Sequence, residues 1–324
     1  MNLTRRPRRL RTTPAMRRLV RETRVSPSQL VWPLFVGEWS EPAPLDSLPG
    51  QFTHSLDSVA RAAESAAEAG LGGLMLFGVP DPAKKDATGS QAIAAGGVLN
   101  RAIGRVRDAV GDDLVIMADT CLDAFTDHGH CGVLRDGEVD NDATVELYAR
   151  QAVAQATAGA HMVGPSGMMD GQVAAIRAGL DEAGFTDTGI IAYAAKYAAS
   201  FYGPFRDAMA SSLEGDRRTY QQDPANRREG VLEARLDEAE GADILMVKPA
   251  GYYLDVLADV ARASSVPVAA YQVSGEYAMI KASAERGWID EEAAFVETVT
   301  AIVRAGADIV LTYAAPQLVD WLEG

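Results

Sequence analysis

The sequence predicts an α/β fold, a (β/α)8 TIM barrel over residues 26–324 that is preceded by an extended N-terminal arm over residues 1–25. Eight short apolar runs alternate with longer amphipathic stretches, which is the order of strands and helices in such a barrel. The runs are continuously apolar, as in strands of a parallel sheet that is buried on both faces. No linker rich in Gly, Ser or Pro divides the chain, so we expect a single domain after the arm.

The expected strands and helices follow one another along the whole chain. The apolar runs cover residues 30–36, 72–78, 113–120, 160–166, 190–196, 242–248, 267–273 and 307–313, and the clearest helical segments cover 55–69, 142–158, 228–241 and 291–306. Gly159, Gly241 and Gly306 each stand between an expected helix and the next strand, where glycine ends helices readily. An open doubly wound sheet is the alternative, but it needs a switch in strand order that the sequence does not show.

The expected arm is basic, with nine arginines in the first 24 residues of a chain whose net charge is −15. We expect it to pack against the acidic surface of a neighbouring subunit. Nucleic acid is not an expected partner, because the rest of the chain has no basic stripe that could follow phosphates. No apolar run reaches the roughly 20 residues of a membrane helix, and no apolar signal-peptide core follows the arginines. We therefore expect a cytoplasmic protein with no membrane partner.

Two lysines end neighbouring strands of the expected barrel, Lys196 in the run IIAYAAK and Lys248 in the run ADILMVK. A lysine held in a poorly solvated place has a lowered pKa, and a second cation nearby lowers it further. The neutral amine attacks a ketone or aldehyde and forms a Schiff base. Two such lysines indicate two carbonyl substrates, or one lysine that activates the other. The alternative is that each lysine only extends its ammonium group to water.

Other polar side chains also follow the ends of the expected strands. Asp119 and Thr120 end the third run, Ser166 the fourth, Gln272 and Ser274 the seventh, and Tyr313 the eighth. Reactive groups of TIM barrels gather at the carboxyl ends of the strands. A barrel with only a structural role has no need of two lysines beside these groups, so the pattern favours an enzyme.

The loop after the third strand predicts a metal site. Cys121, Asp123 and Cys131 together offer two thiolates and one carboxylate, a set that suits zinc and leaves a fourth position for water or substrate. His128 and His130 are alternative ligands, although we expect one of them to act outside the metal shell. A polar loop with two idle thiols, or with a local disulfide, remains the alternative. Reduced thiols are expected, because two cysteines do not make a disulfide framework.

Residues 197–224, which follow Lys196, are expected to form a lid over the barrel opening. This segment contains glycine, proline and five aromatic residues together with Arg206, Arg217 and Gln221. Two arginines on a lid can clamp a substrate carboxylate. The alternative for each of them is a solvated position on the protein surface.

Several longer motifs make the chain resemble the porphobilinogen synthase family, also called δ-aminolevulinic acid dehydratase. They are RPRRLR, GHCGVL, DNDAT, MDGQV, SFYGPFRDA, GDRRTYQ, LMVKPAGYYLD and AYQVSGEYAMIK, and together they span almost the whole chain. The resemblance implies a lyase of tetrapyrrole (heme) biosynthesis. Such an enzyme condenses two molecules of 5-aminolevulinate to porphobilinogen with loss of two waters.

The resemblance also implies a role for each candidate residue. Lys248 forms the principal Schiff base with the substrate that supplies the propionate side, and Lys196 forms the second with the acetate-side substrate. The contacts to the acetate-side carboxylate are Arg206, Arg217 and Gln221, and those to the propionate-side carboxylate are Ser274 and Tyr313. Another lysine Schiff-base enzyme on a TIM barrel, such as a class I aldolase, is the alternative, but it leaves the second lysine unexplained.

The family pattern further implies two metals and an oligomer. Zinc-dependent members have three cysteines, whereas Asp123 stands here at the middle position between Cys121 and Cys131. We therefore expect an active-site Zn²⁺ that is bound more weakly than by three thiolates. Glu233 corresponds to the family's ligand for an allosteric Mg²⁺, which would be held largely through waters. The arm corresponds to the segment by which subunits embrace one another, and the implied assembly is a homo-octamer.

Overall fold

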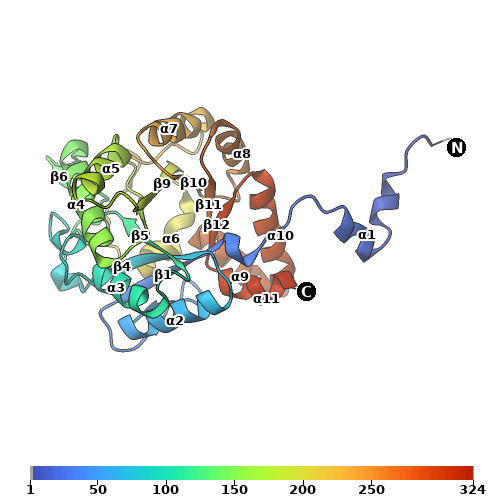
Figure 1. Ribbon diagram of the computed structural model, residues 1–324, viewed down its shortest axis with the longest axis horizontal. Helices are drawn as coiled ribbons and strands as arrows, with labels where there is room; N and C mark the ends of the chain where they lie inside the picture. Colours follow the sequence, from blue (N-terminus) through green and yellow to red (C-terminus); the bar gives the residue numbers. More distant parts are fainter. Residues whose placement is uncertain (1–2, 324) are drawn as a thin grey trace.

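A closed parallel barrel forms the body of the protein. The computed structural model describes residues 3–323, so the first two residues of the expected arm and Gly324 at the end of the expected domain lie outside the described residues. Eight strands pair in the order β12-β11-β10-β9-β8-β5-β4-β1, and β12 also pairs with β1, which closes the sheet. Helices surround the strands (Figure 1). The closure confirms the predicted TIM barrel and shows that the doubly wound alternative is wrong.

All eight predicted strands are present, with bounds that differ from the prediction by no more than two residues. The barrel strands are β1 (Leu30–Gly37), β4 (Gly73–Val79), β5 (Val115–Thr120), β8 (Met162–Pro165), β9 (Gly189–Lys196), β10 (Ile244–Lys248), β11 (Val268–Gln272) and β12 (Ile309–Thr312). Nearly all their side chains are buried on both faces, which explains the continuous apolar runs of the sequence.

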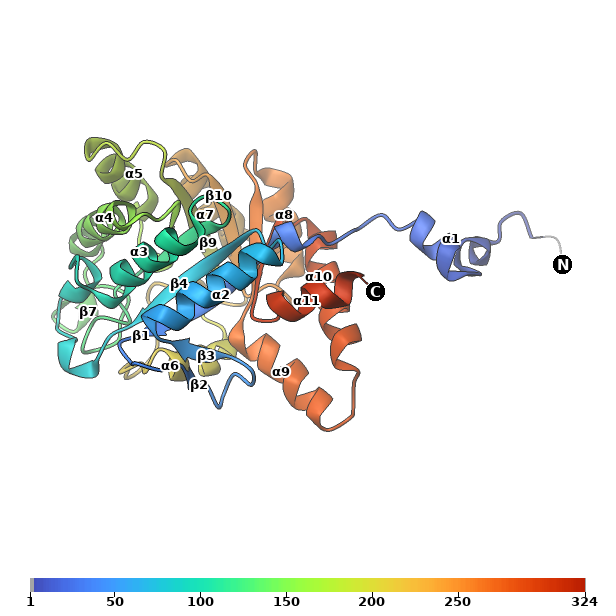
Figure 2. The same ribbon diagram turned by 60° about the horizontal axis from the view of Figure 1, so that its bottom comes forward.

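Four short strands were not predicted. β2 (Ala43–Pro44) and β3 (Phe52–His54) extend the sheet beside β1, and β6 (Leu134–Arg135) with β7 (Glu138–Val139) makes a separate hairpin. Each has only two or three residues, too few to show a hydrophobic period in the sequence. Figure 2 shows β2 and β3 at the same end of the barrel as α6 (Gly203–Ala208).

The four clearest helical segments of the sequence are all helices. They correspond to α2 (Leu56–Glu68), α4 (Asn141–Ala158), α7 (Arg227–Ala239) and α10 (Glu291–Ala305). The remaining helices are α1 (Pro14–Leu19), α3 (Val98–Val110), α5 (Gln172–Glu182), α6, α8 (Leu254–Ala263), α9 (Ser274–Glu285) and α11 (Ala315–Glu323). Residues 3–323 also contain five 3-10 helices: η1 (Pro7–Arg11), η2 (Pro27–Gln29), η3 (Pro82–Lys84), η4 (Ser90–Ala92) and η5 (Ser200–Tyr202).

The three repeated helix-to-strand junctions share one geometry. Gly159, Gly241 and Gly306 have φ angles of 106°, 106° and 120°, a conformation that glycine adopts without the clash of a Cβ atom. After the last two, Asp243 and Asp308 accept hydrogen bonds from N–H groups at the start of β9 and β11, at 2.7 and 2.9 Å. The junctions therefore fix where these two strands begin relative to their neighbours.

Residues 3–19 lie outside the packed barrel, whereas Val25 packs against its core. η1 and α1 contain no buried residue, and both figures show this segment running away from the barrel (Figures 1 and 2). α1 is nevertheless capped locally, because the Thr13 hydroxyl accepts a hydrogen bond from the N–H of Met16 at 3.1 Å. Across residues 3–323, none of the helices combines the length and the hydropathy that a membrane crossing requires.

Candidate active site

Lys196 and Lys248 lie directly beside each other at the ends of β9 and β10. They are paired in the parallel register, and their exposed fractions are 5% and 4%. Just before this pair, one residue of β10, Met246, lies opposite two residues of β9, Tyr193 and Ala194, so β9 contains a bulge. The bulge resets the alternation of side chains, and Tyr193 and Lys196, three residues apart, therefore share the barrel interior.

The amine of Lys248 is enclosed by aromatic rings. Its Nζ lies 4.3 Å from the ring centroid of Tyr271, 5.1 Å from Phe205, 5.2 Å from Tyr193 and 5.4 Å from Tyr202. Burial, followed by the positive charge of Lys196, lowers the pKa of Lys248 to about 7. An amine with this pKa is partly neutral near pH 7, and the neutral amine is the form that can attack a carbonyl.

Lys196 occupies a more polar part of the interior. Its Nζ donates a hydrogen bond to the backbone oxygen of Ser166 and lies 5.7 Å from the ring centroid of Tyr193. Asp119 is buried nearby, and burial together with the charge of Asp123 raises the pKa of Asp119 to about 7, although Lys196 opposes this. One carboxyl oxygen of Asp119 has no hydrogen-bond partner within residues 3–323. A carboxyl group that titrates near neutrality and has a free oxygen can exchange protons with a bound substrate.

The three predicted metal ligands come together in the loop after β5. The distances among the Cys121 sulfur, the Cys131 sulfur and a carboxylate oxygen of Asp123 are all within 4.8 Å. All three residues are buried. Both cysteines are free thiols, which excludes the disulfide alternative for this structure. Burial raises the pKa of Cys121, whereas a hydrogen bond from Cys121 lowers the pKa of Cys131 to about 7. The cluster thus brings together two soft donors and one hard donor around one point.

The two candidate histidines lie at the edge of this cluster. His130 pairs with the hydroxyl of Tyr220 at 3.1 Å through its Nδ1, and His128 lies 3.4 Å from the backbone oxygen of Ala87. Among the described residues, neither histidine belongs to the group of possible metal ligands. Their place agrees with a role outside the metal shell.

Arg217 reaches the metal cluster itself. Its Nη2 donates to a carboxylate oxygen of Asp123 at 3.0 Å and to the backbone oxygen of Gly129 at 2.9 Å. The arginine and the aspartate are both buried, so this is an enclosed ion pair. The Nε atom of Arg217 is also buried, and it has no partner within the described part of the chain. The sequence did not indicate this pair, because its members are 94 residues apart.

The other two residues expected at the acetate-side carboxylate are placed differently. Arg206 is exposed on α6, and Gln221 is buried in the wall of a separate cavity. The structure therefore brings only Arg217 of this predicted set to the metal cluster. Arg206 remains on the lid segment, residues 197–224, from which it can approach only if the segment or its side chain moves.

Ser274 and Tyr313 lie on the opposite side of Lys248. The Ser274 Oγ accepts a hydrogen bond from the N–H of Phe205 at 3.0 Å and donates one to the backbone oxygen of Phe201 at 3.3 Å. The Tyr313 hydroxyl accepts a hydrogen bond from Tyr271 at 3.0 Å. Because Tyr271 is also the ring nearest to Lys248, Tyr313 belongs to the surroundings of this lysine.

Two other residues at strand ends point away from the barrel opening. The Thr120 hydroxyl donates to Gln155 on α4 at 2.7 Å, and Gln272 bonds to Thr298 on α10 and to Thr312. Both side chains face the helical layer and do not belong to the polar groups at the opening. A sequence position at a strand end does not say which face of the sheet its side chain occupies.

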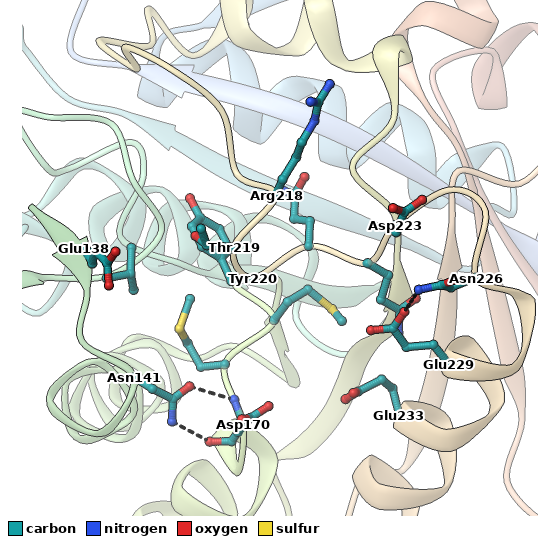
Figure 3. A pocket seen from close by; sticks show the side chains of 15 residues that line it. Glu138, Asn141, Asp170, Arg218, Thr219, Tyr220, Asp223, Asn226, Glu229 and Glu233 are labelled. Carbon is teal, nitrogen blue, oxygen red and sulfur yellow. Dashed lines mark hydrogen bonds between the residues drawn. The ribbon is translucent and has the colours of Figure 1, made fainter.

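Glu233 lies in a different cavity, outside the barrel interior. This cavity of about 470 Å³ is bounded by α7, the end of the lid segment, and the loop between β8 and α5. Its carboxylates are Glu138, Asp170, Asp223, Glu229 and Glu233. Figure 3 shows Asp170, Glu229 and Glu233 directed toward a common space. Burial, and then the charges of Asp170, Glu229 and Glu240, raises the pKa of Glu233.

This acidic cavity adjoins the backbone of Lys196. Gln222 lines the cavity, and its N–H donates to the backbone oxygen of Lys196 at 3.1 Å. Met168 and Met169 line it as well, in the loop that begins at Ser166, whose oxygen accepts from the Lys196 amine. Two segments therefore connect the cavity with the second lysine.

Comparison with known proteins gives one consistent result. The family described as delta-aminolevulinic acid dehydratase matches residues 4–321. A protein of that name from Mycobacterium tuberculosis (strain ATCC 25618 / H37Rv) is 62% identical over 319 residues, which cover 98% of this chain and 97% of the relative. One from Streptomyces coelicolor is 59% identical over 315 residues, with 97% and 96% covered. A crystal structure of delta-aminolevulinic acid dehydratase (porphobilinogen synthase) from Toxoplasma gondii ME49, in complex with the reaction product porphobilinogen, matches with a TM-score of 0.96 at 46% identity, covering 98% of this chain and 92% of that one.

Proposed function

The chain belongs to the delta-aminolevulinic acid dehydratase family and condenses two molecules of 5-aminolevulinate to porphobilinogen, and we propose that Lys248 and Lys196 each hold one of them as a Schiff base. The observation that carries this assignment is the register pair of two buried lysines at the ends of adjacent strands. Each amine attacks the ketone of one substrate and releases a water. The resulting iminium withdraws electrons from the neighbouring carbon and makes it acidic, which prepares the bond between the two substrates.

The surroundings of the two lysines support a division of labour. Lys248 sits among aromatic rings, with Ser274 and Tyr313 close by, and is the propionate-side anchor. Lys196 faces Asp119 and the cluster that contains Arg217, and is the acetate-side anchor. The buried and unpartnered Nε of Arg217 supports its role as a carboxylate contact, because its Nη2 is already used by Asp123. Arg206 and Gln221 complete the acetate-side contacts when their side chains turn toward the substrate, while the lid segment already lies over the barrel opening.

We assign the active-site metal to Cys121, Asp123 and Cys131 and identify it as Zn²⁺. The fit rests on the donor set, since two thiols and a carboxylate converge within 4.8 Å and leave one ligand position for substrate. When bound, the metal acts as a Lewis acid that orients the acetate-side amine and keeps it unprotonated. The chain's own residues position that amine through the Lys196 Schiff base and through Arg217. Because one donor is a carboxylate that is also engaged by Arg217, we expect weaker zinc binding than at three thiolates.

The zinc assignment is tested by metal analysis of protein purified without chelator. We expect up to one zinc per subunit in the native protein and none at this site in a Cys121→Ala, Cys131→Ala double variant. Full activity of the double variant would contradict a functional zinc site.

We further propose that the acidic cavity binds an allosteric Mg²⁺ through Glu233. Clustered carboxylates with little compensating positive charge favour a hard cation, and a roomy cavity suits an ion that keeps most of its waters. The backbone contact between Gln222 and Lys196 gives the site a physical route to the second lysine. In Glu233→Gln we expect any stimulation by Mg²⁺ to disappear, while Glu292→Gln on α10 serves as a control.

The arm over residues 1–25 is proposed to join subunits into a homo-octamer in the cytoplasm. Its exposed apolar side chains include Leu10, Leu19 and Val20, and exposed apolar groups favour contact with a neighbouring subunit. Removal of residues 1–25 should give smaller assemblies by light scattering. An unchanged mass would contradict this role.

The decisive experiment incubates the protein with 5-aminolevulinate alone and assays porphobilinogen with and without a zinc chelator. Product should form without any other substrate. Borohydride should trap 5-aminolevulinate on the protein but not a sugar phosphate, which separates this reaction from that of an aldolase. Failure to form product under every metal condition would refute the assignment.

A further inference from the structure

Lys85 contacts the lid segment, although nothing in the proposed reaction requires it. It follows η3 in the loop after β4, is half-buried, and its Nζ donates a hydrogen bond to the backbone oxygen of Ala210 at 2.9 Å. Its neighbour Lys84 points outward and pairs with Glu38 at 2.7 Å, with a side chain that is 48% exposed. The two adjacent lysines thus have different partners. Of the two, Lys85 contacts the lid segment, at a residue 125 positions later in the sequence.

The contact falls where the lid backbone is strained. Ala210 has a φ angle of 45°, a left-handed conformation in which the Cβ of an L-residue is crowded. Its N–H bonds to Asp207 within the segment, whereas its carbonyl is taken by Lys85. A conformation that is unfavourable by itself persists when its surroundings hold it, and the lysine is the side-chain group that holds this carbonyl.

The segment held in this way carries residues of both substrate sites. α6 ends at Ala208, two residues before the contact, and presents Phe205 to the amine of Lys248 at 5.1 Å from the ring centroid. Arg206 lies on the same helix. Ser274 fastens this helix near its start through the N–H of Phe205. Lys85 fastens the chain just beyond its end, so the two contacts together hold the helix over the barrel opening.

The backbone next to Lys85 is hydrogen-bonded to the loop that carries the metal cluster. The next residue, Asp86, exchanges backbone hydrogen bonds with Phe125 and Asp127, at 3.3 and 3.1 Å. Burial lowers the pKa of Lys85, and the negative charge of Asp123 partly offsets this. Lys85 therefore connects the loop that carries Asp123 with the lid that carries Arg206.

We propose that Lys85 is a positioning residue that latches the lid segment in its closed place over the bound substrates. The inference rests on the proposed role of Arg206 and Arg217 at the acetate-side carboxylate. The contact raises the fraction of molecules in which the two arginines can bind the substrate carboxylate. The apparent affinity for 5-aminolevulinate is proportional to that fraction. Loss of the latch should therefore raise KM more than it lowers kcat.

The test compares Lys85→Met, which keeps the length of the side chain but removes the donor, with Lys85→Arg and Lys84→Met. We expect Lys85→Met to raise KM for 5-aminolevulinate about tenfold, with borohydride trapping at Lys248 retained. Lys85→Arg, which keeps a donor and a charge, should return KM to within about threefold of the native value. Lys84→Met should behave as the native protein, because Lys84 does not contact the lid.

Limited digestion with trypsin gives a readout that does not depend on activity. Arg206 and Arg218 are exposed cleavage positions in the lid, and Arg262 on α8 is an exposed position outside it. Lys85→Met should increase initial cleavage at the two lid positions about tenfold and leave cleavage at Arg262 unchanged. An unchanged KM with unchanged lid cleavage would overturn the latch, and so would an equal rise at Arg262, which indicates general destabilisation. Absence of porphobilinogen formation by the native protein would instead overturn the proposed function and leave the cleavage result standing.

Discussion

The groups around Lys248 come from barrel strands, the start of α9 and the lid segment, which supplies Tyr202 and Phe205, whereas the Lys196 side contains an ion pair between two loops. Tyr193 and Tyr271 are strand residues, and Tyr313 directly follows β12. On the other side, Asp123 belongs to the metal loop and Arg217 to the lid segment, and these two form an ion pair with each other. The half of the site around Lys248 is thus already in place before substrate arrives. In the half around Lys196, Asp123 and Arg217 bind each other and must exchange this contact for metal and substrate. A rigid half that binds first and an adaptable half that completes the reaction fit an enzyme that uses the same substrate twice.

The largest expected effect breaks the rigid half. Lys248→Met removes the amine but preserves much of the volume among the aromatic rings. Porphobilinogen formation should fall by about 10⁴-fold or more, because the nucleophile of a covalent mechanism is lost. Borohydride should no longer trap substrate on the chain to any large extent. Trapping that continues at the native level would show that Lys196 is the principal anchor.

Lys196→Met breaks the other half while leaving the first intact. Product formation should fall by about 10³-fold or more, because the second substrate loses its covalent anchor. One 5-aminolevulinate per subunit should still be trapped, at Lys248, as mass spectrometry of the reduced protein would show. Comparison with Lys248→Met distinguishes two models. If each lysine binds its own substrate, trapping at Lys248 continues in Lys196→Met; if Lys196 only activates Lys248, trapping at Lys248 falls as well.

Asp123→Cys sharpens the comparison at the adaptable half. A third thiolate is a better zinc ligand than a carboxylate, and the change also ends the competition of Arg217 for position 123. We expect zinc affinity to rise roughly 10- to 100-fold in competition with a chelator. Asp127→Cys places a thiol on an exposed position of the same loop and should leave affinity unchanged. Equal gains in both variants would mean that an added thiol acts without the cluster.

The pH dependence of trapping reports the electrostatics that join the two halves. With a pKa of about 7, Lys248 is mostly protonated below pH 7, so its rate of Schiff-base formation should fall about tenfold per pH unit there and level off above. The charge of Lys196 lowers this pKa and that of Asp119 raises it. The midpoint should therefore move up in Lys196→Met and down in Asp119→Asn. Single-turnover trapping over pH 5–9 measures it, and shifts in the opposite directions would contradict the assigned couplings.

Tyr313→Phe should have the smallest effect. It removes one hydroxyl from the rigid half while the ring remains stacked on Phe35 at 6.0 Å between centroids. Loss of one hydrogen bond to a substrate carboxylate costs about 1–2 kcal/mol, so KM should rise about 5- to 30-fold with kcat little changed. The melting temperature should stay within a few degrees of the native value. A KM equal to that of the native protein would remove Tyr313 from the substrate contacts.

The sequence alone determined the positions of all eight barrel strands and placed both lysines at strand ends, because strands buried on both faces must be continuously apolar. It also identified the three members of the metal cluster, which lie close together in one loop. The short strands β2, β3, β6 and β7 escaped prediction because two or three residues carry no detectable period.

Only the tertiary structure decided which of these residues face one another. The bulge in β9 turns Lys196 into the interior beside Tyr193, and no residue type marks that bulge in the sequence. Thr120 and Gln272 stand at equally suitable strand ends but face the helices. The partners of Asp123 and of Ala210 lie 94 and 125 residues away. Sequence patterns record the solvent exposure and the local period of each residue, whereas contacts between distant loops depend on strand register and on how the closed barrel brings its loops together at one opening.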